Sequence, residues 1–393
     1  MSMTLLCIIY LSFIALGLPD SLLGSAWPTM RLEMGAPLPM AGMVSMVCSG
    51  CTILSSLMST RVIRRFGTGR VTMFSTLMTA TALMGYALAP SPWVLVMAAI
   101  PLGLGGGSVD AALNNYVALH YEARHMSWLH CSWGVGAMAG PMILSAVMAS
   151  GGQWRMGYWI CISVQLLLTL MMALTLPLWQ KQKPAAALAQ SAPAENAAMM
   201  SNREALRLPG MMAVLITFLC YCAFESTMGL WTASYAQQKL GATPEQSAFL
   251  TSLFFAGLTL GRALNGFLTM RLSSKFLIRA SIAIILTGVL LMMLPLGYIG
   301  CLLATGLIGL GCAPVYPCTI HETPHRFGTA VSQAATGLQM AFAYTGSTFL
   351  PPLMGLISGA TGMDILPWWL LTLGAGMLLG NEVVNRQTAG KNA

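Results

Sequence analysis

Long uninterrupted apolar stretches constrain the fold of this chain more than any other feature of its sequence. Twelve of them are long enough to cross a bilayer, since a spanning helix needs about 20 apolar residues. Six stretches lie in the first half, at approximately 4–30, 39–60, 70–90, 93–119, 126–149 and 154–178. Six more follow, at approximately 209–236, 245–270, 276–298, 299–319, 327–357 and 364–385. Backbone groups in lipid must be hydrogen-bonded within the segment, so the stretches predict helices, and they lack the alternation of a β-barrel.

Composition supports a membrane protein rather than a soluble one. Hydrophobic residues make up 56% of the 393 residues and charged residues only 8%, whereas a soluble domain carries about 25% charged residues. The surface must therefore face lipid. We expect an all-α membrane protein with twelve transmembrane helices in two pseudo-symmetric six-helix halves.

One polar segment divides the chain. Residues 179–208 are rich in Gln, Lys, Ala, Ser and Asn, a composition that cannot bury enough apolar surface to fold. We interpret this segment as a cytoplasmic linker between an N-terminal half (1–178) and a C-terminal half (209–393).

The basic residues favour one side of the membrane. With a cytoplasmic N-terminus, the connections on that side hold fifteen of the nineteen basic residues. These are Arg61, Arg64, Arg65, Arg70, Arg124, Lys181, Lys183, Arg203, Arg207, Arg271, Lys275, Arg279, Arg326, Arg386 and Lys391. The net charge of +8 is thus explained by topology, as positive-inside asymmetry, and not by nucleic-acid binding. Both termini are predicted to be cytoplasmic.

The two halves also resemble each other locally. Asp20-Ser21 is followed by Gly24 and Trp27 in the first stretch, and Glu225-Ser226 by Gly229 and Trp231 in the seventh. Such weak internal symmetry is typical of transporters built from repeats.

Three acids and one cation lie deep inside the apolar stretches: Asp20, Asp110, Glu225 and Arg262. A charge at this depth is costly unless it is paired, faces a cavity or is neutralised by a proton. One hypothesis is that the acids are proton-coupling groups. The alternative is a permanent pair, for example Arg262 with Glu225, which locks helices together; the sequence leaves this choice open for Glu225.

Polar and aromatic side chains near these acids are candidates for binding a solute. Asn114 lies one turn beyond Asp110 on the same helical face, and a carboxylate with a carboxamide can bind hydroxyl groups. Further candidates are Asn115, Trp27, Trp133, Trp231, Gln333 and His130. The tryptophans can stack on a sugar or simply pack, and His130 can relay protons or simply pack.

Enzyme and cofactor functions have little support. The glycines of 103–107 are followed by no Gly-Lys-Ser/Thr, so they predict close helix packing rather than a phosphate loop. Cys48 and Cys51 form a single C-x-x-C without a second pair. Two groups of residues on predicted cytoplasmic connections could hold a metal ion. They are His120, Glu122 and His125, and His321, Glu322 and His325. We favour the alternative that these are charged and polar loop side chains in contact with water. We expect no cofactor, no metal and no enzymatic activity.

The connection after the second stretch gives the first family resemblance. Residues 61–70 (Arg-Val-Ile-Arg-Arg-Phe-Gly-Thr-Gly-Arg) resemble the Asp-Arg-x-Gly-Arg signature of the major facilitator superfamily. The resemblance implies gating roles for Arg64, Arg65 and Gly67, with Arg262 as a further structural residue. Arg64 stands where the signature has Asp, and in the family that Asp helps to latch the cytoplasmic gate.

Two motifs resemble the fucose:proton symporter branch of this superfamily. Residues 17–23 (Gly-Leu-Pro-Asp-Ser-Leu-Leu) are similar to its first-helix Asn-Leu-Asn-Asp-x-Leu-Leu, and residues 109–114 to its fourth-helix Glu-Thr-Ala-Ala-Asn. The resemblance implies that Asp20 and Asp110 serve proton coupling and sugar binding. Asp110 replaces the Glu of the branch, and Asn115 replaces the proline that usually follows.

These observations predict a proton-coupled symporter of a small polar solute, with a monosaccharide as the favoured class, working by alternating access. The rival hypothesis is a proton-antiporting exporter of drugs or metabolites; a membrane enzyme, a sensor and a channel are less favoured. We expect a monomer in a bacterial inner membrane whose partners are the solute, protons and the bilayer.

Overall fold

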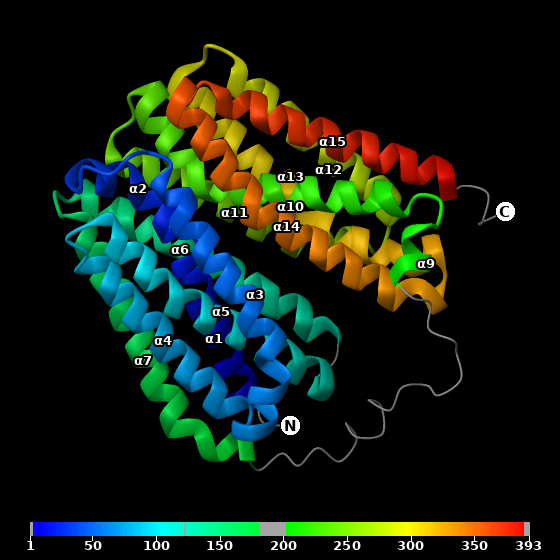
Figure 1. Cartoon of the computed structure of the whole chain (residues 1–393), viewed down its shortest axis with the longest axis horizontal. Coiled ribbons are helices and arrows are strands. Elements are labelled where there is room, and N and C mark those ends of the chain that lie inside the picture. Colours follow the sequence, from blue (N-terminus) through cyan, green and yellow to red (C-terminus); the bar gives the residue numbers. More distant parts are fainter. Residues whose placement is uncertain (1–2, 122, 181–201, 389–393) are drawn as a thin grey trace. The chain divides into compact units, whose positions relative to one another are not determined.

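The computed structural model describes residues 3–121, 123–180 and 202–388, and within these ranges the chain is helical throughout and contains no strand (Figure 1). The first unit of the fold holds the helices α1 (Met3–Asp20), α2 (Leu22–Glu33), α3 (Met40–Phe66), α4 (Thr68–Ala87), α5 (Pro92–His120), α6 (Ala123–Ala149) and α7 (Trp154–Gln180). The remaining helices are α9 (Asn202–Leu206), α10 (Met211–Leu240), α11 (Pro244–Leu268), α12 (Ser274–Met293), α13 (Gly297–Phe327), α14 (Thr329–Thr361) and α15 (Ile365–Thr388).

The twelve predicted spans correspond to the long helices of the structure, so the fold class is confirmed. The first span is made of two helices, α1 and α2, which meet at Ser21. The predicted division between the ninth and tenth stretches is also found, although a few residues earlier, because α12 ends at Met293 and α13 begins at Gly297. By length and composition alone, nine of the described segments qualify as membrane spans. The other three long helices are α4, α14 and α15.

Contacts divide the chain into two compact units. The first unit comprises Met1–Ser191 and Gly229–Phe255, and the second comprises Ala192–Met228 and Ala256–Ala393. The adjoining ends of α10 and α11 therefore group with the helices of the first unit. Most of the predicted linker, residues 181–201, lies outside the described residues. After it, α9 is a short helix that precedes α10.

Glycines with positive φ end several helices where the chain turns into the next one. Gly67 lies between α3 and α4 with φ 79°, and Gly328 lies between α13 and α14 with φ 91°. Residues with a side chain rarely adopt this conformation, whereas glycine adopts it readily. Gly67 therefore forms a one-residue connection between two helices that needs glycine.

Glycines also allow helices of the first unit to approach closely. A Cβ atom at Gly17 would lie 2.1 Å from the carbonyl oxygen of Trp133, and one at Gly136 would lie 2.0 Å from that of Ile14. These contacts join α1 to α6 backbone against backbone. In lipid the hydrophobic effect does not drive helices together, so close packing of small residues stabilises the bundle instead.

The predicted packing role of the glycines in 103–107 is confirmed. A Cβ at Gly103 would lie 2.1 Å from the carbonyl oxygen of Cys48, and one at Gly107 would lie 2.4 Å from that of Thr52. Gly105 meets α4 in the same manner, because a Cβ there would lie 2.7 Å from the Ser75 carbonyl oxygen. The glycines of α5 thus seat it against both α3 and α4.

Gly136→Ala tests the contact between α1 and α6. The added methyl group would overlap the Ile14 carbonyl oxygen, so we expect the free energy of unfolding to fall by about 1–3 kcal/mol. Thermal unfolding of the purified protein in detergent measures the change. Gly50→Ala is the matched control, because Gly50 is exposed on α3 and nothing lies within 4 Å of its added Cβ. Equal stability of Gly136→Ala and the wild type would contradict the packing account.

Candidate functional site

Asp20 lies where the first membrane span is interrupted. Pro19 precedes it inside α1, and the helix stops at Asp20 before α2 begins at Leu22. The Ser21 hydroxyl at the break donates a hydrogen bond of 2.7 Å to the Ala137 carbonyl of α6. Asp20 itself is exposed, and its Oδ2 accepts a hydrogen bond of 2.8 Å from the indole Nε1 of Trp133. The carboxyl group of Asp20, at the break between α1 and α2, therefore accepts its hydrogen bond from a neutral side chain, Trp133.

Asp110 lies on α5 and is also bound by a neutral partner. The side-chain amide of Asn114 donates to Asp110 Oδ1 at 2.8 Å and to the Asp110 backbone carbonyl at 2.9 Å. Asp20 and Asp110 lie on α1 and α5, two helices of the first unit that contact each other.

Aromatic side chains surround the Asp20 end of this pair. The Trp133 ring packs edge-on against Phe255, with 6.0 Å between the ring centroids. His130, one turn earlier on α6, packs edge-on against Phe13 at 5.9 Å. His130 is exposed and Trp133 is half-buried. Trp133 therefore contacts Asp20 directly, whereas His130 lies one helical turn from Trp133.

Two of the predicted aromatic candidates lie instead in the protein core. Trp27 is fully buried, and its indole Nε1 donates a hydrogen bond of 3.0 Å to the Leu38 carbonyl. Its side chain ties α2 to the segment that follows it. Trp231 is fully buried on α10, near the point where the backbones of Gly24 and Gly229 meet. Their positions favour the packing alternative for both tryptophans.

Glu225 differs from the two aspartates because its partner is charged. Arg262 Nη2 of α11 lies 3.6 Å from Glu225 Oε1 of α10, and both side chains are largely buried, with 18% exposure each. The sequence left open whether these residues pair, and the structure shows that they do. The pair favours a structural role for Glu225 over the predicted proton-coupling role.

The other predicted residues are less closely associated with the acids. Asn115, next to Asn114 on α5, is exposed. Arg64 and Arg65 are exposed at the end of α3, and Arg65 lies over the ring of Phe66 at 5.5 Å from its centroid. The side chain of Gln333 lies outside the described residues.

Sequence analysis missed a second buried arginine. The prediction ended the tenth span at 319 and treated Glu322 and Arg326 as charges of a connection, but α13 continues to Phe327. Arg326 is only 2% exposed and Glu322 8%. Arg326 Nε lies 4.0 Å from Glu322 Oε2, and Arg326 Nη2 donates a hydrogen bond of 3.0 Å to Asn385. The spacing of four residues between an acid and an arginine is the signal that could have identified this pair.

The histidines of the two candidate metal groups have other partners. His125 Nδ1 bonds to the Tyr10 hydroxyl at 2.7 Å, and His120 Nδ1 bonds to the Tyr116 carbonyl at 2.9 Å. His321 belongs to α13 and lies 3.4 Å from the Ser274 hydroxyl. Glu122 lies outside the described residues, and in the part that is described no three His, Cys, Asp or Glu side chains are placed to hold a metal ion.

The fold and this arrangement define a multi-pass helical membrane protein of the transporter class, and comparison with known proteins supplies the family. A family model described as Major Facilitator Superfamily matches residues 9–333. The chain therefore belongs to the Major Facilitator Superfamily, and this membership indicates transport rather than catalysis.

Two similar proteins extend over nearly the whole chain. The "Bypass of stop codon protein 6" of Saccharomyces cerevisiae (strain ATCC 204508 / S288c) is 22% identical over 392 residues, covering 92% of this chain and 79% of that protein. A crystal structure of a bacterial homolog to the human lysosomal transporter Spinster, in an inward-facing and occupied conformation, has a TM-score of 0.75 at 11% identity. That likeness covers 98% of this chain and 97% of the other, and it shows the fold alone.

The Glu225–Arg262 pair can be tested with a double-mutant cycle. Glu225→Gln leaves the Arg262 charge without its carboxylate in a largely buried position, so we expect a loss of stability of about 1–3 kcal/mol. The double variant Glu225→Gln with Arg262→Gln should be less destabilised than the sum of the two single variants. Thermal unfolding of the four proteins in detergent measures this coupling, and strict additivity would contradict the pair.

Proposed function

We propose that the chain is a proton-coupled symporter of a small polar solute, with a monosaccharide as the favoured class. Asp20 and Asp110 are the coupling acids, and Asn114 and the nearby aromatic side chains contact the solute. The protein would lie in a bacterial inner membrane with both termini cytoplasmic, and would work as a monomer. Its two halves, 1–178 and 209–393, would rock about a site near the middle of the membrane, with 179–208 as the linker.

One observation carries the proposal: the acids of the described spans have partners of two kinds. Glu225 and Glu322 each face an arginine, whereas Asp20 and Asp110 are bound by neutral donors, Trp133 and Asn114. A carboxylate in a bilayer that lacks a cation is costly. A proton is the simplest group that neutralises it.

Reorientation of the carrier would depend on this neutralisation. With a proton and solute bound, the site holds less charge, so moving it past the apolar middle of the membrane costs less. Without them, the ionised acids would hold the empty carrier back. Proton movement and solute movement would thereby be coupled through the charge of the same two residues.

The solute class is inferred from the groups that lie beside the two acids. Asn114 and the carboxyl group of Asp110 together offer donors and acceptors for hydroxyl groups. Trp133, beside Asp20, has a ring that could stack on the apolar face of a sugar. The resemblance of residues 17–23 and 109–114 to motifs of the fucose:proton symporter branch favours the same class.

Proteoliposomes with an inward proton gradient test the function directly. We expect one solute from a panel of sugars, sugar acids and nucleosides to acidify the lumen, because each transport cycle carries a proton inward. Asp110→Asn should abolish this acidification and any accumulation against a gradient, while exchange of solute across the membrane can persist. Glu204→Gln is the matched control, because it removes a carboxylate at an exposed position of α9 and should leave transport unchanged.

Two outcomes would contradict the proposal. Full accumulation by Asp110→Asn would remove the coupling role from this residue. Absence of acidification with every solute, together with efflux of hydrophobic cations, would instead support the exporter alternative.

A further inference from the structure

The connection between α3 and α4, taken as residues 61–70 so that it includes the end of α3 and the start of α4, carries an excess of positive charge. Residues 34–109 contain four arginines and no aspartate or glutamate, and the four arginines all lie within 61–70. All four side chains are exposed. Among the described residues none of the four is in an ion pair, whereas Arg155 is paired with Glu33 and Arg279 with Glu382.

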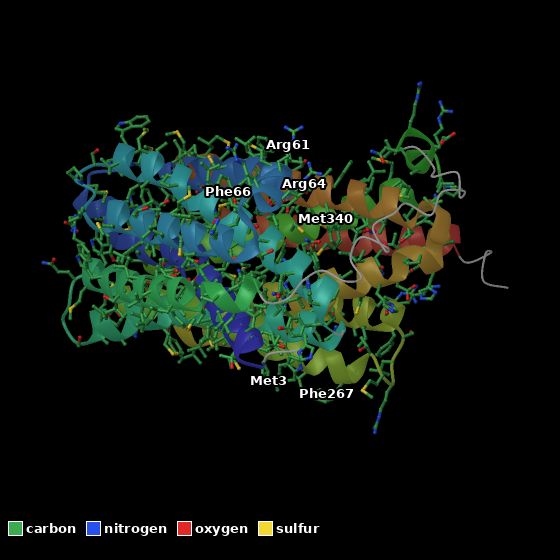
Figure 2. All side chains as sticks on the ribbon, turned by 90° about the horizontal axis from the view of Figure 1, so that it is seen from below. Met3, Arg61, Arg64, Phe66, Phe267 and Met340 are labelled. Atoms are coloured by element: carbon green, nitrogen blue, oxygen red, sulfur yellow. The ribbon has the colours of Figure 1, made fainter. Side chains whose placement is uncertain are left out.

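On both α3 and α4, the arginines lie on the same helical face as a row of exposed apolar side chains. On α3, Leu54, Leu57 and Met58 are exposed by 53%, 78% and 49%. Arg61, Arg64 and Arg65 follow at the spacing of three and four residues that keeps side chains on one helical face. Figure 2 shows Arg61 at the outer edge of the helix that carries it.

The same pattern appears on α4. Arg70 is followed on its face by Phe74 and Leu77, which are exposed by 55% and 38%. In a membrane protein, exposed apolar faces of this kind meet lipid acyl chains. At 1.5 Å per residue, Arg61 and Arg65 lie about 6 and 12 Å beyond Leu57 along α3, toward the end of the helix.

The tetrapeptide Arg-Phe-Gly-Thr occurs twice in the chain, and a comparison of the two copies shows that the turn at Gly67 does not by itself force Arg65 and Phe66 outward. Arg65-Phe66-Gly67-Thr68 joins α3 to α4, and Arg326-Phe327-Gly328-Thr329 joins α13 to α14. The central glycines have nearly the same backbone, with φ 79° and ψ 153° at Gly67 and φ 91° and ψ 156° at Gly328.

The two copies differ in where the side chains go. Arg326 and Phe327 are buried, with 2% and 6% exposure, because Glu322 and Asn385 receive the guanidinium group. Arg65 has no such acid in its helix or in the next one and is exposed, and Phe66 is 48% exposed. Arg65 and Phe66 therefore point outward, whereas Arg326 and Phe327 are packed inside the protein.

We propose that the connection between α3 and α4 binds the headgroups of anionic phospholipids in the adjacent leaflet through Arg61, Arg64, Arg65 and Arg70. Phosphate groups match arginine in geometry and charge, because the planar guanidinium donates two parallel hydrogen bonds to them. Phe66 would sit at the boundary between headgroups and acyl chains. The segment that resembles a gating signature therefore serves as an anchor to the membrane surface.

Lipid binding to the full-length protein tests this proposal. The protein, purified in detergent, is titrated with phosphatidylglycerol or with phosphatidylcholine, and bound lipid is counted by native mass spectrometry. We expect phosphatidylglycerol to bind preferentially. The variant Arg61→Gln with Arg64→Gln and Arg65→Gln should lower its apparent affinity by about tenfold or more, since each arginine contributes about fivefold near an anionic surface.

Matched variants separate the proposed site from net charge. Arg203→Gln with Arg207→Gln and Arg271→Gln removes the same number of exposed charges elsewhere, and should change the affinity by less than about twofold. Arg61→Lys with Arg64→Lys and Arg65→Lys keeps the charge but loses the planar guanidinium, so its affinity should lie between those of the wild type and the triple glutamine variant. If the triple glutamine variant does not fold, Arg64→Gln alone should still lower the affinity by about fivefold.

Three results would overturn the proposal. The first is equal binding of phosphatidylglycerol and phosphatidylcholine by the wild type. The second is an equal loss of binding in the two triple glutamine variants. The third is full displacement of phosphatidylglycerol by inorganic phosphate at millimolar concentration, which would identify a site for soluble phosphate rather than a lipid surface.

Discussion

The cost of a charge in the bilayer is the constraint on which the account of this protein depends. Water is absent there, so each embedded acid needs a cation, a cavity or a proton. The described structure matches its buried arginines to acids, Arg262 to Glu225 and Arg326 to Glu322. Asp20 and Asp110 are left with the neutral donors Trp133 and Asn114. The acids that face an arginine, Glu225 and Glu322, hold their surroundings together. The acids that have neutral partners, Asp20 and Asp110, are those whose charge can change.

The helices that carry these acids are positioned by backbone contacts rather than by large side chains. Gly17 and Gly136 let α1 lie against α6, and Gly103 and Gly107 let α5 lie against α3. Asp20 and Trp133 are on the first pair of helices, and Asp110 is on α5. Because small residues set these distances, the Asp20–Trp133 hydrogen bond depends on glycines that never touch the carboxyl group.

The sequence predicted the twelve-span architecture well, because spanning length and charge asymmetry are imposed by the bilayer and are visible residue by residue. It also singled out Asp20, Asp110 and Glu225, but only the structure shows that Glu225 alone of these three is paired with an arginine. It could not decide between Trp27 as a solute contact and Trp27 as a core residue, since that depends on whether Leu38 folds back to accept its indole hydrogen. It missed the Glu322–Arg326 pair because charges near a span end look like a solvated connection until the helix is seen to continue to Phe327. Nor did it predict the break at Ser21, for which Pro19 was the available signal.

Infrared difference spectroscopy of the protein in lipid tests the central claim most directly, because protonated carboxyl groups absorb separately from carboxylates. The account predicts a protonated-carboxyl band at neutral pH that disappears on alkaline titration. The band should be weakened in Asp20→Asn and Asp110→Asn and unchanged in Glu225→Gln. A band that is absent from the wild type, or that is lost only in Glu225→Gln, would contradict the assignment of the proton to the two aspartates.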